Sequence, residues 1–492
     1  MSLIIYGSII LSILQSIFFW RKEPGISVFL YTIIFITFLI YVLIKYKKVK
    51  NKNALIGIIP ITLLSSTYFL YNNQFLKGLN SIVIIILIGI MCLYLTKDKI
   101  MDSKICQNLL RILFGALDTV DEVVNFFKRK RNEEIDEKSE KIRKIGKSIL
   151  ISIPIIIVVL ILLISADQVF ASIFNNIFYY FGNIFSIKEM TNLIMRIIVI
   201  IIAFGYIGGY LINLVKEDTI YNQKEDDEHK EKIKIEDITM NTTLTILNII
   251  YLIFCIIQFT NLFTQVSHNS NFDYSGYARR GFFQLMFVSL INFGIIFISN
   301  INKKEKTEKK YTKIMSILII AFTIIIIISA FYRMYLYEQE YGYTYLRLFV
   351  YFILATELLI TIPIIMYILK NNVNLVKSSI IIITTMYLIL NFINIDYVIA
   401  QKNINRYFEN NESKSIDLSY LIKNTDTDAI AQMAKLLNSK DMQVVQSVKY
   451  YLKEQEEILE NEKINLLELN LSKLRAKKIL SKLNIEIDLD SN

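Results

Sequence analysis

The stretch KIMSILIIAFTIIIIISAFY, residues 313–332, decides the class of fold. After Lys313 it carries no charged side chain, and its length of about 20 residues is what an α-helix needs to cross the hydrocarbon core of a bilayer. Neither glycine nor proline interrupts it, and it lacks the alternation of apolar and polar residues that is typical of a membrane β-strand. We therefore predict that this stretch is a membrane-spanning helix.

Similar apolar stretches recur along the first four-fifths of the chain, and 54% of the 492 residues are hydrophobic. That share is above what a soluble globular chain normally carries. We predict an all-α, polytopic helical membrane protein with about eleven spans and a small soluble α-helical C-terminal unit. The expected spans are 3–20, 25–45, 54–71, 79–95, 147–165, 192–215, 241–264, 281–299, 313–332, 346–369 and 377–394.

The charges of the connecting loops predict the orientation of these spans. Alternate loops, among them the one with KKEKTEKK at 303–310, carry about thirty Lys and Arg, whereas the loops between them carry about six. Because basic loops stay in the cytoplasm, the amino terminus should lie inside and the C-terminal tail outside a cell membrane. The same topology accounts for the net charge of +10, so we expect the lipid bilayer as partner and no nucleic acid.

The composition divides the chain into four expected regions. Residues 1–100 hold about four spans, and residues 101–146 form a cytoplasmic segment with an interfacial amphipathic helix. Residues 147–395 form a membrane core of about seven spans. Residues 396–492 are nearly balanced in charge and show helical spacing at Val444, Val448 and Leu452, which predicts a soluble helical region outside the cytoplasm.

The usual catalytic signatures are missing from the sequence. It contains no Walker loop, no G-x-S-x-G and no H-E-x-x-H. Cys92, Cys106 and Cys255 are scattered, and two histidines, His229 and His268, leave little material for a histidine-based zinc site, so we expect no cofactor, no metal site and no disulfide framework. An enzyme is the less favoured interpretation.

Arginine dominates the few basic residues of the outer loops, although lysine is far commoner in the chain as a whole. Because a guanidinium group binds carboxylate or phosphate through two parallel hydrogen bonds, this bias predicts either a site for an anionic group or arginine–acid pairs that fasten helix ends together. The candidate site residues are Asp167, Arg279, Arg280, Arg333, Glu338, Arg347, Asp396 and Arg406.

Glu357 lies about eleven residues inside the tenth expected span, near the middle of the bilayer. An ionisable group at that depth is costly and normally faces protein or water. It is a candidate intramembrane relay, or else a protonated or paired structural residue.

Four short stretches of the predicted outer side resemble an uncharacterised bacterial membrane family, domain of unknown function 4173. The matching positions are Ser165 to Asp167, Tyr277 to Phe282, Arg333, Met334, Glu338, Tyr341, Gly342, Arg347 and Asn394 to Tyr407. The resemblance covers approximately residues 145–440. It implies a bacterial cell-envelope membrane protein and implies nothing about a substrate.

Three functions stay open at this stage. The first is a non-enzymatic protein that binds an anionic envelope component, a lipid group or a protein partner at the outer arginine–acid cluster. The second is a secondary transporter that uses Glu357 at the midplane. The third is an envelope-modifying transferase with an outer acid such as Asp167 or Asp396 as its base.

Overall fold

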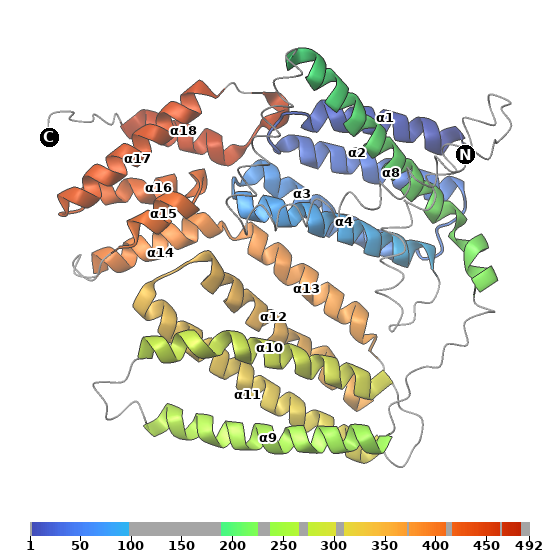
Figure 1. The fold of residues 1–492 in the computed structure, drawn as a ribbon, viewed down its shortest axis with the longest axis vertical. Helices are drawn as coiled ribbons and strands as arrows, with labels where there is room; N and C mark the ends of the chain where they lie inside the picture. The colour runs from blue at the N-terminus through green and yellow to red at the C-terminus, as the bar shows by residue number, and fades with distance from the viewer. Residues whose placement is uncertain are drawn as a thin grey trace, which may run out of the picture. The chain divides into compact units, whose positions relative to one another are not determined.

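A computed structural model of the protein describes residues 2–97, 188–224, 237–264, 274–301, 309–370, 373–409, 416–462 and 465–483. Within these ranges the chain forms α-helices, short 3-10 helices and turns, and no strand (Figure 1). In hydrocarbon every backbone N–H and C=O must be bonded within its own segment, so isoleucine-rich runs that would favour strands in water become helices. The predicted all-α class is confirmed.

The chain divides into two compact units. Unit 1 contains Met1–Tyr68, Asn80–Glu228 and Asn465–Leu469, and unit 2 contains Phe69–Leu79, His229–Ile464 and Asn470–Asn492. Packing groups the short segment 69–79 with helices that are distant in sequence.

Unit 1 is built from the N-terminal helices and α8. Its elements are α1 (Ser2–Phe19), α2 (Ile26–Lys45), η1 (Lys52–Gly57), α3 (Ile58–Leu70), α4 (Gln74–Thr96) and α8 (Lys188–Lys224), although the last residues of α3 and the first of α4 belong to unit 2. α1 packs against α2 and α8. Asn80 joins α4 to α3 by donating to Thr67 Oγ1 at 3.1 Å, and Arg196 joins α8 to α1 by donating to Ser16 Oγ at 2.8 Å.

Unit 2 contains a bundle of long helices. They are α9 (Asp237–Thr264), α10 (Tyr274–Ile301), α11 (Lys309–Tyr341), α12 (Tyr345–Lys370) and α13 (Leu375–Phe392). α11 lies against α9, α10 and α12, and α12 also contacts α13 (Figure 1). Two apolar clusters fill the spaces between α9, α10, α11 and α12, and both draw mainly on isoleucine, leucine and phenylalanine.

The C-terminal helices of unit 2 form a further core. They are α14 (Ile395–Glu409), α15 (Leu418–Asn424), η3 (Thr427–Ala429), α16 (Ile430–Met433), η4 (Ala434–Asn438), α17 (Met442–Asn461) and α18 (Leu471–Leu483), with η5 (Leu466–Glu468) in unit 1. Their apolar side chains bury a single cluster that also takes in Leu76 of α4 and Leu390 of α13. This helical region therefore packs directly on the ends of membrane helices.

Nine segments of the described chain are long and apolar enough to cross a membrane. They lie in α1, α2, η1 with α3, α4, α8, α9, α11, α12 and α13. The expected span at 281–299 falls in α10, whose apolar part is Phe283–Ile296. The expected span at 147–165 and the interfacial helix of 101–146 lie outside the described residues. The chain is a multi-pass membrane protein.

Leu452 tests the C-terminal core, because its side chain is fully buried there. Leu452→Ala should cost about 2–5 kcal/mol, since it removes buried methyl groups and leaves a cavity. Tyr450→Ala on the same helix is the matched control, because Tyr450 is 67% exposed. Thermal unfolding of the purified protein in lipid nanodiscs should show a lower midpoint for the first variant only; equal midpoints would contradict this core.

Candidate functional site

A sharp turn, Gly342 to Thr344, connects α11 to α12. Gly342 has a φ of +76°, and its N–H donates to Glu338 O at 2.7 Å, which is how a glycine commonly ends a helix. A Cβ at this position would overlap Asn403 Oδ1 of α14. Both the backbone angle and the available space therefore require glycine.

Asn403 holds the turn with both ends of its side-chain amide. Its Oδ1 accepts from the Tyr343 N–H at 2.8 Å, and its Nδ2 donates to the Tyr343 carbonyl at 2.8 Å. The pair of bonds satisfies a main chain that has left the helix, where unpaired polar groups would be costly. It also fixes α14 against the turn.

Two of the predicted arginines bind main-chain carbonyls at the C-terminal end of α11. Arg406 Nη2 donates to Gln339 O at 2.7 Å and to Glu340 O at 2.6 Å. Arg347 donates to Gly342 O and stacks over the Tyr337 ring at 4.4 Å from its centroid. The last carbonyls of a helix have no partner within it and form its negative end, so both guanidinium groups are well placed there.

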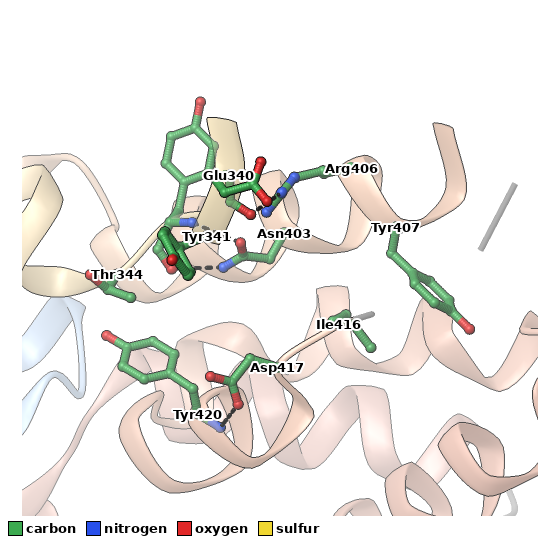
Figure 2. Close-up of a pocket in the computed structure, with 10 residues that line it drawn as sticks. Glu340, Tyr341, Thr344, Asn403, Arg406, Tyr407, Ile416, Asp417 and Tyr420 are labelled. Atoms are coloured by element: carbon green, nitrogen blue, oxygen red, sulfur yellow. Dashed lines mark hydrogen bonds between the residues drawn. The ribbon is translucent and has the colours of Figure 1, made fainter. Parts of the chain in front are cut away.

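A cavity of about 360 Å³ opens beside this turn (Figure 2). Figure 2 shows Asn403 and Arg406 on one side, with Asp417 and Tyr420 across from them. The lining is polar and rich in tyrosine: Glu340, Tyr341, Tyr343, Thr344, Asn403, Arg406, Tyr407, Ile416, Asp417 and Tyr420. Asp417 also caps α15 by accepting from the Tyr420 N–H at 2.9 Å.

Two tyrosine hydroxyls of this lining, those of Tyr343 and Tyr420, are held in their neutral form. Burial, and then a hydrogen bond to Glu338 and its negative charge, raise the pKa of Tyr343. Burial also raises the pKa of Tyr420 to about 12, although the Arg347 charge opposes that rise. At neutral pH these side chains therefore present O–H groups that can donate and accept.

A second polar group, which we call the acid–amide cluster, consists of Asp396, Asp426 and Asp428 with Asn72 and Asn73. Asn72 donates through its N–H to Asp428 Oδ2 at 2.8 Å and through Nδ2 to Asp426 Oδ1 at 2.6 Å. Asn73 Nδ2 donates to Asp396 Oδ2 at 3.1 Å and to the Tyr345 hydroxyl at 2.6 Å. The cluster joins the segment before α4 to α12, α14 and η3.

The carboxyl group of Asp396 is 1% exposed, and its Oδ1 has no hydrogen-bond partner within the described part of the chain. Burial, and then the charges of Asp428 and Asp426, raise its pKa well above the ordinary value. Burial also raises the pKa of Asp426. The residues that the structure describes include no group of three or more His, Cys, Asp or Glu placed to hold a metal ion.

The structure brings some predicted site residues together and leaves others apart. Arg406 lines the cavity, Glu338 and Arg347 border its turn, and Asp396 lies in the acid–amide cluster. Arg333 is buried in α11. Arg279 and Arg280 lie in α10, but their side chains are not among those that the structure describes. Asp167 lies outside the described residues.

Several residues of the site were not among the sequence candidates. The additional ones are Asn72, Asn73, Asn403, Asp417, Tyr420, Asp426 and Asp428. Asn403 lies within the stretch Asn394 to Tyr407 singled out in the sequence, and Asp417 has the position of a helix cap, so a signal existed for those two.

Glu357 lies in the middle of α12 and is 2% exposed, with its Oε2 2.5 Å from Ser289 Oγ of α10. It is not part of the cavity lining. The candidate relay and the candidate binding site are therefore two separate features of unit 2.

Fold and site together define a multi-pass helical membrane protein with a tyrosine-rich cavity where two spans meet. The chain belongs to the family described as domain of unknown function (DUF4153), whose model matches residues 58–436. Neither a curated protein nor a solved structure matches the chain.

The resemblance to domain of unknown function 4173 was wrong, because the family model that matches is a different one. The resemblance rested on four short stretches of sequence, in which Arg, Tyr and Gly recur for general physical reasons. The match extends back to residue 58 and so includes α3 and α4, which the resemblance left out.

Gly342→Ala should destabilise the protein by about 1–3 kcal/mol, because alanine strains at positive φ and its methyl group displaces the Asn403 amide. Gly294→Ala is the matched control: it lies within α10, and a Cβ there meets nothing within 4 Å. Thermal unfolding in nanodiscs measures both. An unchanged midpoint for Gly342→Ala would contradict the clamped turn.

Asp396→Asn should make stability less dependent on pH. The pKa of Asp396 is higher in the folded state than in the unfolded state, where it is about 3.9. Protonation of Asp396 therefore stabilises the folded wild type at low pH, and that contribution is lost as the pH rises through the folded pKa. Asparagine mimics the neutral acid, so the variant should match the wild type near pH 4 and unfold at a higher temperature at pH 8. An Asp396→Asn variant that is less stable than the wild type at pH 8 would contradict a neutral Asp396.

Proposed function

We propose that this chain is a bacterial cell-envelope membrane protein, not an enzyme, that binds a hydroxyl-rich, phosphate-bearing lipid headgroup in the cavity beside Gly342. The single observation that carries the proposal is the composition of the cavity. Four tyrosines, one arginine and two acids converge on it from α11, α14, α15 and the segments before α12 and α15. Tyrosine rings can pack against a sugar ring, tyrosine and arginine can donate hydrogen bonds to phosphate, and the carboxylates can accept hydrogen bonds from hydroxyl groups.

The position of the cavity along the spans supports a headgroup as ligand. α11 ends at Tyr341 and α12 begins at Tyr345, so the cavity lies at the end of two helices that are long and apolar enough to cross a membrane. Lipid headgroups border the ends of such spans, and tyrosine side chains are favoured there. A ligand could enter the cavity while its acyl chains remain in the bilayer.

The distribution of charge supports an extracytoplasmic location for the cavity. The opposite end of α11 begins within the basic stretch KKEKTEKK at 303–310. The short loop between α12 and α13 is bordered by Lys370 and Lys377. Basic loops favour the cytoplasmic side, so the turn at Gly342 would lie outside. This orientation is part of the proposal.

The acids in the cavity narrow the ligand class. Arg406 and Arg347 donate to main-chain carbonyls, so part of their donor capacity serves the fold and not a ligand. Glu340 and Asp417 would repel a bare polyanion, but their oxygens accept from hydroxyls. A headgroup with sugar or glycerol hydroxyls and a single phosphate fits this mixture better than a multiply charged ligand.

Secondary transport is a second candidate, favoured by one observation. Glu357 and Ser289 form a buried polar pair between α12 and α10, near the middle of their spans. For the third alternative, an envelope-modifying transferase, Asp396 is the described candidate base, and it is buried and absent from the cavity lining.

Tyr341→Ala and Glu340→Gln test the proposed function, because neither side chain is buried. Each should reduce occupancy by a co-purifying lipid about threefold to tenfold, as expected for the loss of one stacking or hydrogen-bonding contact. Native mass spectrometry of protein extracted from its own membranes identifies the lipid and measures its occupancy. Tyr450→Ala, an exposed tyrosine of α17, is the control.

Two results would contradict the proposal. Equal occupancy in Tyr341→Ala, Glu340→Gln and Tyr450→Ala would show that the lipid binds elsewhere. A bound lipid without hydroxyls in its headgroup would show that the ligand class is wrong.

A further inference from the structure

We propose that Glu357 binds a proton within the membrane, as a neutral carboxylic acid whose O–H donates to Ser289. The inference concerns α10 and α12 and does not depend on the headgroup cavity. It rests on the number of hydrogens available to the atoms around Ser289.

Ser289 Oγ has two close oxygen neighbours. Met286 O lies at 2.7 Å and Glu357 Oε2 at 2.5 Å, both within hydrogen-bond distance. A serine hydroxyl has one hydrogen to donate. If it donates to Glu357, no hydrogen lies between Ser289 and Met286 O, because a carbonyl cannot donate. If it donates to Met286 O, the hydrogen toward Glu357 must belong to the carboxyl group.

The second arrangement places one hydrogen in each contact. The Glu357 O–H donates to Ser289 Oγ, and the Ser289 O–H donates to Met286 O. The Ser289–Glu357 separation of 2.5 Å and the Ser289–Met286 separation of 2.7 Å both lie within the ordinary range for O–H···O hydrogen bonds. A protonated Glu357 thus accounts for both distances, whereas an ionised Glu357 accounts for only one.

The other carboxyl oxygen supports the same protonation state. Glu357 Oε1 is buried and has no hydrogen-bond partner among the residues that the structure describes. As the carbonyl oxygen of a neutral acid it costs about 1–3 kcal/mol when unpaired, whereas burying an isolated charge is far more expensive.

The surrounding spans offer no compensating charge. Between Arg347 and Lys370, α12 has no Asp, Lys, Arg or His and no other Glu, and α11 has no charged residue between Lys313 and Arg333. The apolar stretch of α10, Phe283–Ile296, likewise has none. The apolar cluster that contains Met286 and Leu354 also contains three titratable side chains, Tyr251 of α9, Tyr337 of α11 and Tyr351 of α12.

In a neighbouring chain of hydrogen bonds, each contact likewise contains one donated hydrogen. The Tyr251 hydroxyl donates to Asn292 Oδ1 at 2.5 Å, and Asn292 Nδ2 donates to Thr323 Oγ1 at 2.9 Å. Thr323 in turn donates to Ile319 O at 2.7 Å. Ser289 and Asn292 lie one turn apart on α10, so the Glu357 site belongs to a buried polar seam within the bundle.

Difference infrared spectroscopy of the full-length protein in nanodiscs at pH 7.5 tests the proposal. Subtracting the spectrum of Glu357→Gln from that of the wild type should show one carbonyl-stretch band of a neutral carboxylic acid per protein. Glu457→Gln, which removes an exposed acid of α17 outside the cavity, is the matched control and should remove carboxylate bands instead. Loss of carboxylate bands in Glu357→Gln would overturn the proposal.

Ser289→Ala provides the test if Glu357→Gln does not fold. Removing the hydroxyl removes the acceptor of the carboxyl O–H, so the neutral-acid band should remain and move to higher frequency. If the carbonyl-stretch band of the neutral acid has the same frequency in the wild type and in Ser289→Ala, the proposal is also overturned.

Discussion

The clamp of Asn403 on the main chain of Tyr343 is the interaction on which the site depends. The chain reverses direction at Gly342 between α11 and α12, and the turn leaves main-chain carbonyls and N–H groups without partners inside either helix. The amide of Asn403 satisfies one residue of that turn, and Arg406 satisfies the last carbonyls of α11. Because both come from α14, the turn cannot be closed without bringing α14, and the helices packed on it, to the same place.

Hydrogen-bond satisfaction explains both special regions of unit 2. At the end of the spans, charged guanidinium groups are tolerated because helix carbonyls and aromatic rings surround them. Between Lys313 and Arg333 of α11, and between Arg347 and Lys370 of α12, no charged side chain is present that could pair with Glu357. Glu357 therefore relies on Ser289 and on its own proton. The same low dielectric medium therefore selects a charged group at one depth and a neutral group at another.

The spans could be predicted from the sequence because hydrocarbon leaves the backbone few alternatives to the helix. Local spacing also predicted the burial of Val448 and Leu452 in α17. In α18 the buried residues include Ala476 and Leu480, and their burial depends on contacts with helices elsewhere in the chain, among them α17. Arginine bias indicated Arg347 and Arg406. One partner shared by Asp426 and Asp428, Asn72, lies more than 350 residues away, and no local pattern encodes such a pairing.

The clamped turn at Gly342 shapes the cavity in which we propose that a lipid headgroup binds. The most direct measurement is an electron cryomicroscopy map of the protein in nanodiscs made from its native membrane lipids. The account predicts headgroup density in contact with Tyr341 and Glu340, continuous with acyl chains beside α11. A cavity closed by its own side chains, or one that holds only water while lipid is bound elsewhere, would contradict it.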